Sequence, residues 1–114
     1  MKLREVSEIL GAQVLAGKKY LDREVCFAFS SDLMSDVLTV DLKNTLLITG
    51  LSNLQALRTA EMSDINQLVI VRNKEVTAEM IALAEENQVV LMKSEYSLFR
   101  VSGILYQAGI KPVY

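Results

Sequence analysis

Four stretches of mostly apolar residues recur along the chain, and polar residues and then a segment with helical spacing follow each of them. The apolar stretches cover residues 25–29, 45–49, 68–71 and 89–92. Runs without alternating polar positions are typical of strands that helices cover on both faces. Strands that alternate with helices require crossover connections. The pattern therefore predicts an α/β fold with a mostly parallel sheet of about four to five strands and helices packed against it.

A short amphipathic helix is expected at the start of the chain, with Gly11 at its end. The positions that we expect to face the core in this and the next three helices are Leu3, Val6, Ile9, Leu10, Leu33, Met34, Val37, Leu38, Leu54, Leu57, Ala60, Met80, Ile81 and Ala84. Residues 12–17 are expected to form a brief strand and a turn.

The last helix, expected over residues 96–108, is apolar around most of its circumference. A helix of this kind is either sunk in the core or shared with a partner. We therefore predict a homodimer interface at Phe99, Ile104 and Tyr106. The alternative is that the tail, residues 110–114, folds back over this helix.

Composition narrows the possible functions. The 114 residues suffice for one domain, 1–114, and 51% of them are hydrophobic. The chain has no histidine, which excludes Ser-His-Asp and Cys-His nucleophile systems and removes the commonest zinc ligand. Its single cysteine, Cys26, lies between apolar residues and is expected to be an inert core thiol. We predict no enzyme activity, no metal and no cofactor.

Charge argues against a nucleic-acid partner, because 12 basic and 14 acidic residues give a net charge of −2 without a basic cluster. No apolar stretch approaches the roughly 20 residues that a membrane-spanning helix needs. The N-terminus also lacks the pattern of a signal peptide. We therefore expect a cytoplasmic protein.

Polar residues follow the predicted strands, where ligands usually bind in α/β sheets. This edge predicts a site for a small anionic ligand formed by Ser30, Asp32, Thr49, Gly50, Ser52, Asn53 and Ser94. The alternative is that these side chains only cap helices. For Gly50 we expect a turn with unusual backbone angles, since the chain has no glycine-rich phosphate loop.

Carboxylates are not expected to form a catalytic pair. The candidates Asp32, Asp36, Asp41 and Asp64 fall mostly on predicted solvated helix faces, and the pair Glu85-Glu86 has no evident role.

Several segments resemble the DRTGG domain family, whose members are regulatory domains similar to the N-terminal domain of HPr kinase/phosphorylase. The resemblance rests on residues 6–17, on Leu46-Leu47-Ile48-Thr49-Gly50 and on residues 94–99. Where the family commonly has a Gly-Asp-Arg turn, this chain has Gly50-Leu51-Ser52, and Arg72-Asn73 replaces a common glycine pair. We therefore expect the acidic–arginine pair of the family to be missing.

The resemblance implies a stand-alone, non-catalytic regulatory or interaction domain in bacterial or archaeal energy metabolism. Such a domain would sense a small anionic metabolite or dock on a partner enzyme. Two alternatives are a small-molecule enzyme or transferase that uses Asp32, Asn53 and Lys93, and a structural oligomerisation unit.

Overall fold

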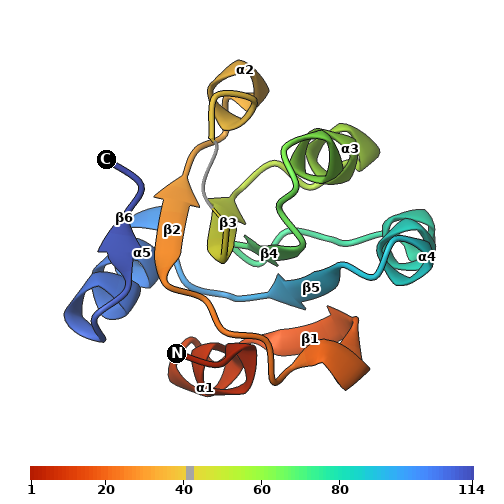
Figure 1. Ribbon diagram of the computed structural model, residues 1–114. Coiled ribbons are helices and arrows are strands. Elements are labelled where there is room, and N and C mark those ends of the chain that lie inside the picture. Colours follow the sequence, from red (N-terminus) through yellow and green to blue (C-terminus); the bar gives the residue numbers. More distant parts are fainter. Residues whose placement is uncertain (41–42) are drawn as a thin grey trace.

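Strands and helices alternate along residues 1–40 and 43–114, the part of the chain that the computed structural model describes (Figure 1). In chain order the elements are α1 (Leu3–Ile9), β1 (Gln13–Ala16), the 3-10 helix η1 (Lys18–Tyr20), β2 (Phe27–Ser30), α2 (Met34–Val37), β3 (Thr45–Thr49), α3 (Leu54–Met62), β4 (Gln67–Ile70), α4 (Ala78–Glu86), β5 (Val90–Lys93), α5 (Leu98–Gln107) and β6 (Lys111–Pro112).

The sheet has the strand order β1-β5-β4-β3-β2-β6. Only β1 runs antiparallel to its neighbour among these six strands, so the predicted α/β fold with a mostly parallel sheet is confirmed. The strand count exceeds the prediction because Lys111 and Pro112 pair with Phe27 and Ala28 at the edge of the sheet. The tail thus folds back onto the sheet, and it leaves the outer face of α5 uncovered.

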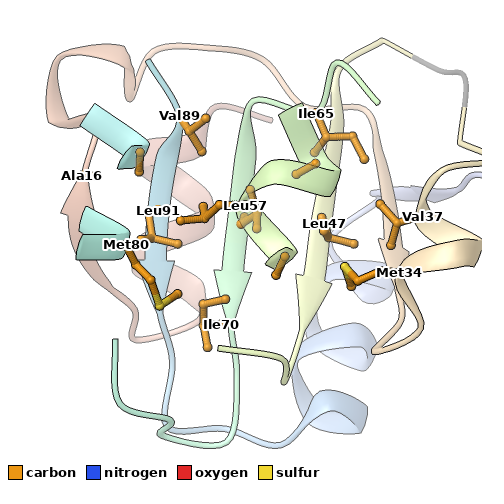
Figure 2. Close-up of a cluster of buried hydrophobic side chains, with 14 of the residues drawn as sticks. Ala16, Met34, Val37, Leu47, Leu57, Ile65, Ile70, Met80, Val89 and Leu91 are labelled. Atoms are coloured by element: carbon orange, nitrogen blue, oxygen red, sulfur yellow. The ribbon is translucent and has the colours of Figure 1, made fainter. Parts of the chain in front are cut away.

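Two apolar cores lie on opposite faces of the sheet. In β3, Leu47 packs towards α2, α3 and α4, whereas Leu46 and Ile48 pack towards α1 and α5. This alternation follows from the two-residue period of a strand. Figure 1 shows the same division of the helices, and Figure 2 shows the first core, where Leu47 and Leu91 meet helical side chains such as Leu57. Burial on both faces explains why the strands are apolar without alternation.

Side-chain caps set the starts of the three longer helices. The side chains of Asn53, Thr77 and Ser97 each accept a hydrogen bond from the backbone N–H three residues later. Each cap of this kind stabilises a helix by about 1 kcal/mol. Because Ser97 is the cap, α5 begins at Leu98, two residues after the predicted start.

Two predictions about polar side chains are wrong. Cys26 is exposed, because it precedes β2 and its neighbour Val25, not Cys26, occupies the core position there. Glu85 has a structural role, since its Oε1 accepts a hydrogen bond from the Gly17 N–H at 2.6 Å and so joins α4 to the turn after β1. Asp41, one of the carboxylates considered above, lies outside the described residues.

Candidate functional site

Four residues from three strand ends converge at the carboxyl edge of the sheet. Asp32 follows β2, Thr49 and Gly50 end β3, and Arg72 follows β4. Asp32 Oδ1 accepts hydrogen bonds from the Gly50 N–H at 2.6 Å and from the Thr49 hydroxyl at 3.1 Å. Asp32 Oδ2 accepts one from Arg72 Nη2 at 3.0 Å, which makes an ion pair. We refer to these four residues as the Asp32–Arg72 cluster.

Gly50 gives the Arg72 side chain room to reach Asp32. A Cβ atom on residue 50 would overlap the Arg72 guanidinium. Gly50 itself does not have a positive φ, so the predicted turn with unusual backbone angles is wrong. Glycine is needed here because another side chain lies against its Cα, and a larger residue would push the guanidinium away from Asp32.

The backbone around Arg72 has an unusual shape. Arg72 and Asn73 have φ values of 66° and 52°, a left-handed region that glycine adopts without steric cost. Their N–H groups donate to Tyr96 O at 2.8 Å and to Ser94 O at 3.1 Å, which joins the ends of β4 and β5. The backbone at Arg72 and Asn73, where the resemblance places a common glycine pair, is therefore left-handed in this chain, and Arg72 adds a guanidinium to it.

Asp32 is held in its charged form. Partial burial alone raises the pKa of the Asp32 carboxyl, but the hydrogen bonds from Gly50 and Thr49 and the charge of Arg72 together outweigh it. The pKa of Asp32 is therefore lowered from its ordinary value. The side chains of Asp32 and Arg72 are 42% and 45% exposed, so the pair remains accessible from solvent.

Two of the predicted ligand-binding residues are committed to contacts elsewhere. Ser94 is only 1% exposed, and its hydroxyl donates to Leu10 O at 3.1 Å. The Ser30 hydroxyl lies 2.8 Å from the Ser102 hydroxyl of α5, beside a cavity of about 250 Å³ between α5 and β6. These two hydroxyls therefore bind neighbouring groups and do not contact the Asp32–Arg72 cluster.

Ser52 and Asn53 lie near the cluster in sequence but have other partners. The Ser52 hydroxyl donates to Glu75 O at 2.5 Å, and Asn53 caps α3 through Ala56 N–H. Both residues line a separate hollow between the starts of α3 and α4. The structure thus brings together Asp32, Thr49 and Gly50 of the predicted set and assigns capping or bracing contacts to the rest.

Arg72 is the cluster member that the predicted site omitted. The pair of opposite charges was sought within one turn after β3, where the chain has Leu51 and Ser52. In the structure the acidic partner comes from the end of β2 and the arginine from the end of β4. One pattern in the sequence could have indicated Arg72. A glycine follows β3, and an acidic and a basic residue follow the two strands that flank β3 in the sheet.

The second predicted surface is the outer face of α5. Phe99 and Tyr106 are 89% and 70% exposed, whereas Ile104 is partly buried against the core of that face. Gly103 lies between them in the helix, and a Cβ atom there would meet nothing within 4 Å. Arg100, the charged residue of this face, lies with its guanidinium carbon 3.8 Å from the centre of the Tyr96 ring. The face thus carries two exposed aromatic side chains beside the open surface at Gly103, together with the polar residues Arg100 and Gln107.

The cluster presents the donors of an oxyanion site, namely a backbone N–H, a hydroxyl and a guanidinium. Within the described residues, no group of three or more His, Cys, Asp or Glu side chains could hold a metal ion. Over the same residues, no helix is both long and apolar enough to cross a membrane.

Comparisons with known proteins agree with this fold. One solved structure aligns with a TM-score of 0.74 and 12% identity, over 94% of this chain and 46% of the other. It is the regulatory region of Clostridium perfringens pyrophosphatase, with CBS and DRTGG domains, in complex with the activator diadenosine tetraphosphate. The present chain thus spans about half of that one, and no curated protein matches it significantly. The sequence profile of the DRTGG domain matches residues 5–108, so the chain belongs to the DRTGG domain family.

Proposed function

We propose that this DRTGG domain is a non-catalytic, cytoplasmic regulatory module that senses a small anionic metabolite at the Asp32–Arg72 cluster. The observation that carries the proposal is that Arg72 Nη2, the Gly50 N–H and the Thr49 hydroxyl all bind one carboxylate, that of Asp32, at the carboxyl edge of the sheet. Donors of these three kinds bind phosphate and carboxylate oxygens in proteins. The similar pyrophosphatase region binds a ligand that is rich in phosphate oxygens, which supports the same class of ligand here.

The alternative enzyme would use Asp32, Asn53 and Lys93. Asp32 is bound to Arg72, and the Asn53 side chain is bound to the first turn of α3. Neither side chain is placed for proton transfer or for attack on a substrate, because the oxygens of both already accept hydrogen bonds from other parts of the chain. A regulatory domain that signals to a partner enzyme fits these contacts better, and ligand binding without turnover is the expected behaviour.

The test is a titration followed by backbone amide chemical shifts, with inorganic phosphate, pyrophosphate and ATP as probes. We expect the largest shifts at Gly50 and Asn73. Arg72→Ala should weaken binding about ten- to a hundredfold, since a hydrogen bond to a charged group contributes about 1.5–3 kcal/mol. Lys74→Ala is the matched control, because Lys74 is an exposed cation two residues away. Shifts confined to α5 or to the amino edge of the sheet would contradict the proposed site.

A second function is self-association through the outer face of α5. Phe99 and Tyr106 project beside the hollow at Gly103, and the hollow can receive an aromatic side chain from another helix. A second copy of the chain supplies both the aromatic side chain and the hollow, as a two-fold symmetric interface requires. We therefore assign the homodimer interface to Phe99, Gly103 and Tyr106, with Ile104 supporting it from the side.

A further inference from the structure

Asp32 occupies a position that suits the oxyanion of a ligand. Its two carboxylate oxygens accept hydrogen bonds from the Gly50 N–H, the Thr49 hydroxyl and Arg72 Nη2, with donor–acceptor distances of 2.6, 3.1 and 3.0 Å. These donors lie at the ends of two neighbouring parallel strands, β3 and β4. We propose that Asp32 is a built-in competitor, which fills a phosphoryl-binding site and must leave before a phosphoryl ligand can bind. This inference rests on the function proposed above and adds how the site is regulated.

The backbone that carries the donors is held in place, whereas the acceptor lies on a loop. Thr49 and Gly50 are buried, and the Thr49 oxygen also accepts a hydrogen bond from the Leu51 N–H at 3.1 Å. The backbone of Arg72 is held by its hydrogen bond to Tyr96 O. Asp32 instead belongs to the short connection between β2 and α2. A ligand can therefore exchange with the Asp32 carboxylate without disturbing the strands that supply the donors.

Charge explains why the two anions exclude each other. A phosphoryl group brings one to two negative charges and several acceptor oxygens, and it competes for the same guanidinium and N–H. With Asp32 in place the new anion meets a like charge at hydrogen-bond range. Once Asp32 has left, the three donors face the ligand alone. A phosphoryl group should then be preferred over a carboxylate, because its charge is larger and it offers more acceptor oxygens to the three donors.

The experiment compares phosphate and pyrophosphate binding by the wild-type chain, Asp32→Ala and Asp32→Asn, with Gly50 amide shifts and calorimetry as readouts. Removal of the competitor should tighten binding about fivefold in Asp32→Ala, because the Asp32–Arg72 pair that the ligand has to break is more than one third exposed. Asp32→Asn should gain less, because the amide oxygen still accepts the Gly50 N–H. Asp36→Ala removes an exposed carboxylate from α2 and is the matched control, with binding expected as in the wild type. The double variant Asp32→Ala, Arg72→Ala should lose the gain.

Each outcome decides the inference. If Asp32→Ala binds no more tightly than the wild type while Gly50 shifts in both, Asp32 is no competitor and the proposed function stands. If Gly50 shifts in none of the proteins, the proposed function and this inference both fail. Acetate binding as tight as phosphate binding would overturn the assignment to phosphoryl ligands. If Asp32→Ala does not fold, Asp32→Asn decides, and affinity equal to that of the wild type overturns the inference.

Discussion

The Asp32–Arg72 cluster and the outer face of α5 are the two candidate contact surfaces of this domain. They differ in whether their side chains already have partners within the chain. In the cluster every hydrogen bond of the Asp32 carboxylate goes to another part of the chain. On α5, Phe99 and Tyr106 stand in solvent beside an open hollow at Gly103. A ligand at the first surface must therefore replace an internal partner, whereas a second copy at the other surface has only water to displace.

The difference follows from the kinds of group involved. An unpaired buried donor or acceptor costs about 1–3 kcal/mol, so polar groups in a fold find partners within the chain. Among the described residues no buried side-chain nitrogen or oxygen lacks a hydrogen bond. Exposed apolar side chains carry a smaller penalty each, and a chain can leave them open for a partner. A satisfied polar site suits regulated binding, and an open apolar face suits constitutive association.

The largest predicted effect separates the two sides of α5. Leu105→Ala removes a side chain that is 1% exposed and should lower the free energy of unfolding by about 2–5 kcal/mol. Phe99→Glu changes a side chain that is 89% exposed and should leave the free energy of unfolding of the isolated chain within about 0.5 kcal/mol. Phe99→Glu should nevertheless convert a dimer into a monomer. Urea unfolding at low protein concentration and light scattering at high concentration measure the two effects.

Met62→Glu is the control for the association measurement. Met62 is 74% exposed at the end of α3, among the helices on the opposite face of the sheet. Its replacement adds the same charge elsewhere and should leave the mass in light scattering unchanged. A wild-type chain that is monomeric at high micromolar concentration would show that the α5 face is not a dimer interface.

Local patterns predicted α5 better than the cluster. The predicted inward stripe was Leu98, Val101, Leu105 and Ala108. Val101 and Leu105 are buried and Leu98 is partly buried, whereas Ala108 is exposed. The same helical period places Phe99 and Tyr106 on the other side. Such a pattern involves neighbours within ten residues and needs no knowledge of the sheet. The α/β architecture was predictable for the same reason, because each apolar strand and each amphipathic helix carries its own local signal.

The cluster could not be read in the same way. Asp32 and Arg72 are 40 residues apart, and only the strand order, with β2 and β4 on either side of β3, brings them together at Gly50. Ser94 shows the opposite case. It follows β5 at the predicted edge of the sheet, but its hydroxyl is buried and donates a hydrogen bond to Leu10 O. Sequence position indicates which edge of the sheet a residue reaches, whereas the neighbours at that edge decide whether its side chain is free.

Gly103→Ala sharpens the comparison at α5 with a smaller effect. A Cβ atom at this position meets nothing within 4 Å, and glycine costs about 1 kcal/mol relative to alanine inside a helix. The variant should therefore raise the free energy of unfolding of the isolated chain by about 1 kcal/mol. If a second helix packs against Gly103, the same methyl group should weaken the dimer. Urea unfolding tests the expected gain in stability, and the dimer dissociation constant tests the expected loss of affinity. An unchanged dissociation constant would show that Gly103 does not lie in the interface.

The smallest predicted effect concerns acid sensitivity, which only the cluster should show. Because the folded-state pKa of Asp32 lies below its unfolded value of about 3.9, the carboxylate contributes stability above about pH 4 and loses it as the pH falls through the folded pKa. The pair is more than one third exposed, so the contribution should be at most about 1 kcal/mol.

The stability difference between the wild type and Asp32→Asn should therefore shrink between about pH 7 and about pH 3, as urea unfolding would show. Asp36→Asn removes the charge of an exposed carboxylate on α2 and is the matched control. Dimerisation through Phe99, Gly103 and Tyr106 involves no carboxylate and should stay constant over this range. A stability difference that is constant or grows towards low pH would mean that the Asp32 carboxylate is not held by its three donors in solution.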